Sequence, residues 1–141
     1  HSFPTRRSSD LAVWHLNLHS MPNNAYERLQ IKSAHPLADF VLGDRDGSTC
    51  EPGFVALVES HLRAKGYTVA RNDPYKGVAL IARIGQPALS RHSLQIEIRR
   101  PIYMDEHTRE RSADFDTVQR DITELLQAMG AYLKAHPSLK A

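Results

Sequence analysis

A histidine and a glutamate lie at the ends of two strand-like segments, and together they offer parts of a hydrolytic metal site. His19 follows the alternating segment AVWHLNL at 12–18, and Glu97 lies on the polar side of LQIEIRRPIYM, which begins at residue 94. An acid in a mostly buried strand is costly unless it is paired or functional. Neutral imidazole is a common zinc ligand, and a carboxylate beside a metal-bound water can accept its proton. The pair therefore indicates metal-assisted hydrolysis at the edges of two core strands.

Each of these residues also has a simpler interpretation. A single histidine is more often a surface or packing residue than a ligand. Glu97 is followed closely by Arg99 and Arg100, so an ion pair with either arginine would explain it. The two interpretations of Glu97 are compatible, because a neighbouring arginine would keep the acid ionised until it acts. His15 shares the face of His19 but lies roughly 13 Å away along a strand, so we interpret it as structural.

Two other candidates carry less weight. His107 and Glu110 have the H-x-x-E spacing of paired zinc ligands, but they lie in the charged stretch DEHTRER, which favours a solvated loop or helix start. Cys50 is the single cysteine, so no internal disulfide can form, and a packing role is expected for it. A lone thiol fits a reducing compartment, and we expect a cytoplasmic protein.

The loops after the predicted strands hold candidate binding residues. Arg45 lies in GDRDG, and Asn72 and Tyr75 lie in NDPYKG. Binding groups often occupy such loops, although Asp, Asn, Pro and Gly also form turns for structural reasons. Arginines at 45, 99 and 100 have the geometry to hold substrate carboxylates through paired hydrogen bonds.

The hydrophobic patterns predict alternating strands and helices. We expect strands at 12–18, 38–42, 67–71, 78–82 and 93–98, and helices at about 51–65 and 114–135. Pro52 and Gly66 suit the start and the end of the first helix. This order predicts an α/β fold with a mixed, mostly parallel sheet flanked by helices, in one domain over residues 12–136. Residues 1–11, HSFPTRRSSDL, lack this patterning.

Composition excludes several classes of partner. The chain has 141 residues, of which 41% are hydrophobic and 24% charged, and its net charge is only +2. Because no basic stripe is interleaved with aromatic residues, we expect no nucleic-acid partner. No apolar run approaches the ~20 residues of a membrane span, so we expect no membrane association. A small-molecule substrate remains the expected partner, and the oligomeric state stays open.

Four blocks of the sequence resemble the N-formylglutamate amidohydrolase family. They are VWHLNLHSMP, DFVLGDRDGSTC, GYTVARNDPYKG and LQIEIRRPIYMDE, and with the segments around them they cover residues 13 to about 130 in the family's order. The resemblance implies a zinc-carboxypeptidase-like α/β fold. It implies that His19 is the last of three protein ligands to Zn²⁺ and that Glu97 is the catalytic carboxylate. It also implies that Asn72, Tyr75 and Arg99 border the substrate pocket, with Arg45 as a further candidate.

The chain departs from the family in two places. The family's first two zinc ligands, a histidine and an acid, belong to its N-terminal half, and nothing upstream of His19 supplies them. We therefore expect an incomplete, C-terminal part of an amidohydrolase domain, preceded by residues 1–11, which resemble translated adapter sequence. In addition, Val78 follows Gly77 where a second glycine is expected.

These observations predict zinc-dependent hydrolysis of an N-formyl or other N-acyl amino acid. The expected reaction converts N-formyl-L-glutamate to formate and glutamate, and the isolated chain is expected to be inactive. Histidine catabolism is the candidate pathway, which the sequence leaves open. Two alternatives stay open. One is a non-catalytic α/β module that binds an acidic ligand, and the other is a carboxypeptidase-like or acylase-like zinc hydrolase with a different substrate.

Overall fold

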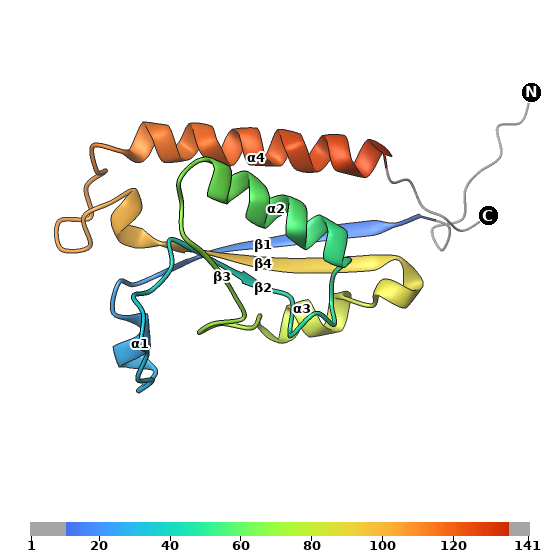
Figure 1. The fold of residues 1–141 in the computed structure, drawn as a ribbon, viewed down its shortest axis with the longest axis horizontal. Coiled ribbons are helices and arrows are strands. Elements are labelled where there is room, and N and C mark those ends of the chain that lie inside the picture. The colour runs from blue at the N-terminus through green and yellow to red at the C-terminus, as the bar shows by residue number, and fades with distance from the viewer. Residues whose placement is uncertain (1–10, 136–141) are drawn as a thin grey trace, which may run out of the picture.

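The structure, a computed structural model, describes residues 11–135. Within these residues, four strands and four α-helices follow one another (Figure 1). Their order is β1 (Val13–Met21), α1 (Ala25–Arg28), β2 (Phe40–Gly43), α2 (Pro52–Ala64), β3 (Val69–Arg71), α3 (Ala79–Ile84), β4 (Arg91–Arg99) and α4 (Phe115–Ala135). Short 3-10 turns lie on either side of β4, at Pro87–Leu89 and Arg100–Ile102.

The strands form one mixed sheet in the order β1-β4-β2-β3. β4 pairs in parallel with β1 and antiparallel with β2, and β2 pairs in parallel with β3. The predicted α/β fold with a mixed sheet is therefore confirmed. The register of β1 against β4 matters most for the chemistry, because it places His19 directly opposite Glu97.

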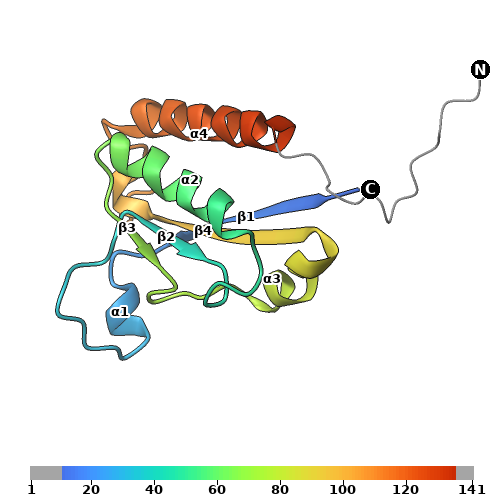
Figure 2. The ribbon, with the colours of Figure 1, turned by 45° about the vertical axis from the view of Figure 1, so that its right-hand side comes forward.

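The main core lies between one face of the sheet and the two long helices. Figure 2 shows α2 and α4 stacked over the same side of the sheet. Side chains of even-numbered strand residues enter this core together with apolar residues of both helices: Phe40, Leu42, Leu94, Ile96, Phe54, Val55, Val58, Leu62, Leu125 and Met129. Because successive side chains of a strand point to opposite faces, the odd-numbered residues of β1, β2 and β4, including His19 and Glu97, face the other side.

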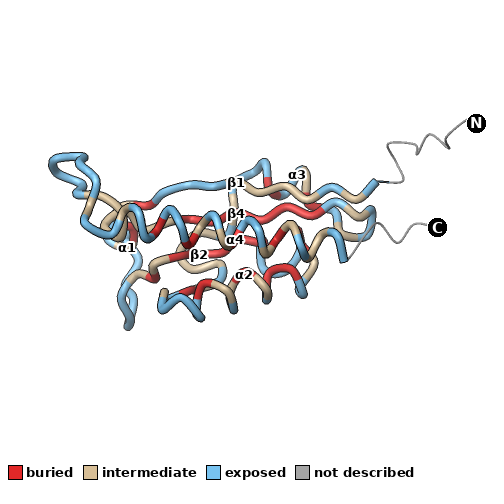
Figure 3. The backbone as a smooth tube through the Cα atoms, turned by 90° about the horizontal axis from the view of Figure 1, so that it is seen from above, coloured by how far each residue is buried: buried red, intermediate tan, exposed pale blue. Residues whose placement is uncertain are grey.

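The second face of the sheet carries only short helices. In Figure 1, α1 and α3 lie on the side of the sheet away from α2 and α4. A small cluster of Met21, Ala38 and Val41 is buried here, with Tyr75 packed against it. Figure 3 shows burial concentrated along β4, whereas much of β1, at the edge of the sheet, is exposed.

Two predicted elements differ from the structure. The predicted strand at 78–82 is wrong, because α3 occupies Ala79–Ile84. A short apolar run cannot by itself distinguish a strand from a helix, and here only Ile81 of the helix is buried. The first strand is longer than predicted, since β1 continues to Met21, so His19 lies inside the strand.

The remaining predicted elements are present with small shifts of their ends. The helices predicted at about 51–65 and 114–135 correspond to α2 and α4. Pro52 is the first residue of α2, and Gly66 follows its end with a φ of 93°. That positive φ favours glycine, which carries no Cβ. None of the helices within residues 11–135 is both long and apolar enough to span a membrane.

Candidate active site

His19 and Glu97 meet on the open face of the sheet. Their Cα atoms are partners in the parallel pairing of β1 and β4, so both side chains point to the same side. His19 Nδ1 lies 3.6 Å from Glu97 Oε1. The imidazole is 42% exposed and the carboxylate is 7% exposed. An accessible imidazole therefore stands beside a buried acid near the carboxyl ends of both strands.

The carboxylate of Glu97 is only partly satisfied. Gln95 Nε2 donates a hydrogen bond of 3.1 Å to Oε1. Oε2 is buried and has no hydrogen-bond partner among the described residues. Burial raises the pKa of Glu97, while the nearby charges of His19 and Arg100 act to lower it. A buried carboxylate oxygen with unused hydrogen-bonding capacity is unusual in a folded protein and is suited to proton transfer.

The interpretation of Glu97 as an ion-pair partner of Arg99 does not hold. The Arg99 guanidinium turns to Asp39, where Nη2 donates a hydrogen bond of 2.7 Å to Oδ1. It also donates to Asn23 Oδ1 at 3.1 Å. The predicted role of Arg99 at a substrate pocket stays a prediction, but its guanidinium already has two partners within the chain.

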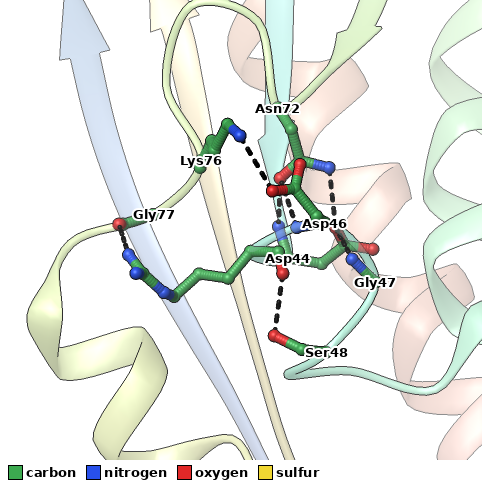
Figure 4. A network of polar contacts seen from close by, with 8 residues as sticks. Asp44, Asp46, Gly47, Ser48, Asn72, Lys76 and Gly77 are labelled. Carbon is green, nitrogen blue, oxygen red and sulfur yellow. Dashed lines mark hydrogen bonds and ion pairs between the residues drawn. The ribbon is translucent and has the colours of Figure 1, made fainter.

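Arg45 and Asn72 lie on two loops that are joined by hydrogen bonds. Figure 4 shows Asn72 and the loop residues around it. Asn72 Oδ1 accepts hydrogen bonds from the backbone N–H groups of Asp44 and Asp46, at 3.1 and 3.2 Å. Asn72 Nδ2 donates to Asp44 Oδ1 at 2.8 Å. Arg45 Nη1 donates to the backbone oxygen of Gly77 at 2.9 Å. These contacts fasten the loop after β2 to the loop after β3, and any role of the two residues in binding substrate stays a prediction.

Tyr75 lies on the same face as the candidate pair. Its ring packs against the buried cluster that contains Met21 and Val41. Burial raises the pKa of its hydroxyl, and the negative charge of Glu97 adds to this effect. The charges of Arg28 and Arg100 lower it. Tyr75 therefore shares the electrostatic surroundings of Glu97, and its place at a substrate pocket stays a prediction.

A cleft of about 1220 Å³ opens beside the carboxyl ends of β1 and β4. Arg28, from α1, and Arg100 both line it. Arg100 Nε donates a hydrogen bond of 3.1 Å to Ser20 Oγ, next to His19 in the chain. The Arg28 side chain makes no hydrogen bond or ion pair with the other residues that the structure describes. Arg28 was not singled out from the sequence, because its place beside β4 arises only when the chain folds.

Gln95 is a second residue that sequence reasoning missed. It is 1% exposed and bonds both to Glu97 and to the backbone N–H of Val78. The sequence did contain a pattern that could have identified Gln95, because a residue two positions before Glu97 in a strand lies on the same face of the sheet.

The described residues do not by themselves form a metal site. Within residues 11–135, no group of three or more His, Cys, Asp and Glu side chains lies close enough to hold an ion. Catalytic zinc usually takes three protein ligands, so His19 alone does not fit that requirement. His107 and Glu110 are exposed, as expected for a solvated loop. Cys50 is buried, and burial raises its thiol pKa to about 12, which agrees with a packing role.

Comparison with known proteins finds relatives that carry the name N-formylglutamate amidohydrolase or N-formylglutamate deformylase. The family model described as N-formylglutamate amidohydrolase matches residues 3–104. The chain is 32% identical over 99 residues to the N-formylglutamate deformylase of Pseudomonas aeruginosa, an alignment that covers 68% of this chain and 37% of that protein. It is also 32% identical over 71 residues to the N-formylglutamate deformylase of Pseudomonas putida, covering 50% of this chain and 27% of that protein.

A solved structure shares the fold closely. The crystal structure of N-formylglutamate amidohydrolase from Ralstonia eutropha JMP134 superposes with a TM-score of 0.87 at 72% sequence identity. The match covers 88% of this chain and 44% of that chain. The chain thus spans less than half the length of these relatives. The interpretation of residues 1–11 as foreign stays a prediction, because residues 1–10 lie outside the described part of the chain.

Proposed function

Because the chain belongs to the N-formylglutamate amidohydrolase family, we propose that it contributes part of the active site of an enzyme that hydrolyses N-formyl-L-glutamate to formate and glutamate. The observation that supports this most is the contact of His19 with Glu97, whose buried Oε2 has no partner among the described residues. A structural acid would be expected to have both of its oxygens satisfied.

Glu97 acts as the general base and then as the general acid in this proposal. Its carboxylate takes a proton from the attacking water as the water oxygen bonds to the formyl carbon. The same proton then passes to the amide nitrogen as the carbon–nitrogen bond breaks. Burial supports both steps, because a raised pKa brings the acid closer to the pH at which it must accept and release a proton.

Zinc dependence is a further part of the proposal. We propose that His19 is one ligand of a Zn²⁺ ion and that the other ligands come from residues other than 11–135 of this chain. This agrees with the lack of a ligand cluster within residues 11–135. It also agrees with the length of the relatives, of which this chain spans less than half.

The role of Glu97 is tested by Glu97→Gln in a protein of full family length that carries this chain. Removing the proton acceptor is expected to lower kcat for N-formyl-L-glutamate by roughly 10²- to 10⁴-fold. Glu59→Gln is the control, because Glu59 lies on α2, on the opposite side of the sheet. A Glu97→Gln enzyme with nearly unchanged kcat would contradict the mechanism. Parallel assays with N-acetyl-L-glutamate and a glutamyl peptide separate this substrate from the acylase-like and carboxypeptidase-like alternatives.

The two arginines of the cleft are suited to bind the carboxylates of the substrate. Arg28 and Arg100 line the cleft, whose lining residues do not include His19 or Glu97. Arg28 acts on Tyr75 through its charge, and Arg100 Nη1 lies 3.9 Å from Glu106 Oε1, a carboxylate that a substrate carboxylate would replace. A guanidinium binds a carboxylate through paired, charge-assisted hydrogen bonds.

Replacing either arginine of the cleft tests this assignment. We expect Arg28→Ala and Arg100→Ala each to raise KM for N-formyl-L-glutamate by about tenfold or more, since hydrogen bonds to charged groups contribute about 1.5–3 kcal/mol. Because ground-state binding is what is lost, kcat should change far less. Arg120→Ala, on the exposed surface of α4, is the control. An unchanged KM in the double variant would place the substrate carboxylates elsewhere.

A further inference from the structure

We propose that Gln95 is a positioning residue that holds the carboxylate of Glu97 in place for proton transfer, and that the backbone N–H of Val78 sets the orientation of the Gln95 amide. The inference rests on the proposed function, since it names a residue that supports the general base of that reaction. It is drawn from a continuous chain of hydrogen bonds that joins a loop to the site.

The orientation of the Gln95 amide follows from its two partners. Val78 N–H donates a hydrogen bond of 3.0 Å to Gln95 Oε1, so this atom must be the amide oxygen. The other end of the amide is then the NH₂ group, which donates to Glu97 Oε1 at 3.1 Å. Gln95 is 1% exposed, so water does not compete for either bond. A buried amide with both ends engaged is held in one orientation.

The loop that carries Val78 is itself fixed by the contacts in Figure 4. The Arg45 N–H donates to the backbone oxygen of Lys76 at 2.8 Å, and the Arg45 guanidinium donates to the backbone oxygen of Gly77. Asn72 fastens the other end of this loop to the backbone of Asp44 and Asp46. The two residues immediately before Val78 therefore have little freedom, and the N–H of Val78 is presented to Gln95 at a fixed point.

The consequence for Glu97 is that its two oxygens have different tasks. Oε1 is held by Gln95 and lies next to His19, whereas Oε2 has no hydrogen-bond partner in the described structure. With Oε1 held, the carboxylate cannot rotate freely, and Oε2 stays available for the proton. Positioning of this kind matters because a small displacement of a reacting group costs a large part of the rate.

Gln95→Met tests the inference in a protein of full family length that carries this chain. Methionine nearly conserves volume and keeps no amide, so packing is retained while both hydrogen bonds are lost. We expect kcat for N-formyl-L-glutamate to fall on the order of tenfold or more, with KM changed by less than about twofold. In a Glu97→Gln background the same substitution should have little further effect on kcat, because the base it positions is already absent.

Val78→Pro provides a second test that leaves Gln95 in place. The φ of Val78 is -72°, which proline adopts without strain, and its side chain is 41% exposed. Proline has no N–H, and its Cδ takes the place of the hydrogen that points at Gln95 Oε1, so the variant removes the bond that orients the Gln95 amide and also pushes that amide aside. Val78→Ala is the matched control, because it shortens the same side chain and keeps the N–H. We expect kcat to fall for Val78→Pro and to stay near the wild-type value for Val78→Ala.

The outcomes separate positioning from a merely structural role. Unchanged kcat in both Gln95→Met and Val78→Pro would overturn the inference, and so would an equal loss in the wild-type and Glu97→Gln backgrounds. If the wild-type protein does not hydrolyse N-formyl-L-glutamate, the proposed function fails, and a crystal structure of Gln95→Met then decides the inference. A Glu97 carboxylate that has moved away from His19 would support the positioning role, and an unmoved carboxylate would refute it.

Discussion

At the scale of single residues, His92 shows how burial selects one charge state of an imidazole. The ring stacks on Trp14 with centroids 4.0 Å apart. Its Nδ1 accepts a hydrogen bond of 3.0 Å from the backbone N–H of Glu51, immediately before α2. Burial lowers the pKa of His92, and the charge of Glu51 opposes this shift. The folded protein therefore favours the neutral ring, since a protonated Nδ1 could not accept that bond.

A pH dependence of stability follows from this shift. Between the lowered pKa of the folded state and the value of about 6.5 in the unfolded chain, the unfolded chain binds more protons. The stabilising effect of the neutral ring is thus present above about pH 6.5 and is lost as the pH falls through this window. We expect the melting temperature to drop between about pH 7.5 and about pH 5.5.

His92→Asn should reduce that drop, because an asparagine oxygen can accept the Glu51 hydrogen bond and carries no titrating proton. His107→Ala is the control, since His107 is exposed. Thermal unfolding of the three proteins at both pH values is the measurement. An equally steep pH dependence in His92→Asn would show that His92 does not cause it.

At the scale of elements, the sequence predicted a helix or strand correctly where the hydrophobic pattern was long or strictly alternating. The spacing of Val118, Leu125 and Met129 predicted α4, and the alternation around Leu94 and Ile96 predicted β4 with the correct faces. Alternation also implied that Gln95 and Glu97 share a face, although the importance of Gln95 was not recognised. The strand expected at 78–82 was wrong because so short an apolar run cannot distinguish a strand from the helix that the structure has there.

Strand pairing was the part of the site that sequence patterns could not supply. No local pattern states that β1 neighbours β4 or that His19 is paired with Glu97, since pairing depends on contacts between residues far apart in the chain. For the same reason, Arg28 could not be linked to the cleft from its local sequence. The resemblance to a family supplied the expectation that His19 and Glu97 act together, and their roles in catalysis stay predictions.

Gly43, the last residue of β2, lies close to the backbone of the loop that carries Val78. This close approach predicts that a larger residue at position 43 lowers the stability of the protein. A Cβ atom at Gly43 would lie 2.8 Å from the carbonyl carbon of Lys76, closer than real contacts allow. We expect Gly43→Ala to lower the free energy of unfolding by about 1–3 kcal/mol, as overpacking does. Gly130→Ala, in α4, has open space around its new Cβ and should stabilise by about 0.5–1 kcal/mol. Urea unfolding of both variants measures the difference, and a Gly43→Ala protein as stable as the wild type would contradict the close approach.

At the scale of the whole molecule, the chain carries one side of a site and leaves another side open. β1 forms an edge of the sheet, and Val13 and Leu18 on this strand are 43% and 48% exposed. His19 is also accessible, although its neighbour Glu97 is buried. This arrangement agrees with the comparisons, in which the matched part of this chain covers 37% of the Pseudomonas aeruginosa protein and 44% of the Ralstonia eutropha chain.

The zinc content of the purified protein tests whether this chain holds a complete metal site. We expect the purified 141-residue chain to retain far less than about one zinc per molecule after dialysis, since one histidine cannot hold the ion tightly. The complete site is tested in a fusion protein, in which this chain is joined to the unmatched part of the Ralstonia eutropha protein. We expect the fusion to retain about one zinc per molecule, and we expect His19→Ala in the fusion to lower that zinc content. Elemental analysis measures all three proteins, with His15→Ala in the fusion as the control, because His15 bonds to Ser93 inside the chain. Stoichiometric zinc in the chain alone would mean that its own residues complete the site, and unchanged zinc in His19→Ala would mean that the ion is bound without His19.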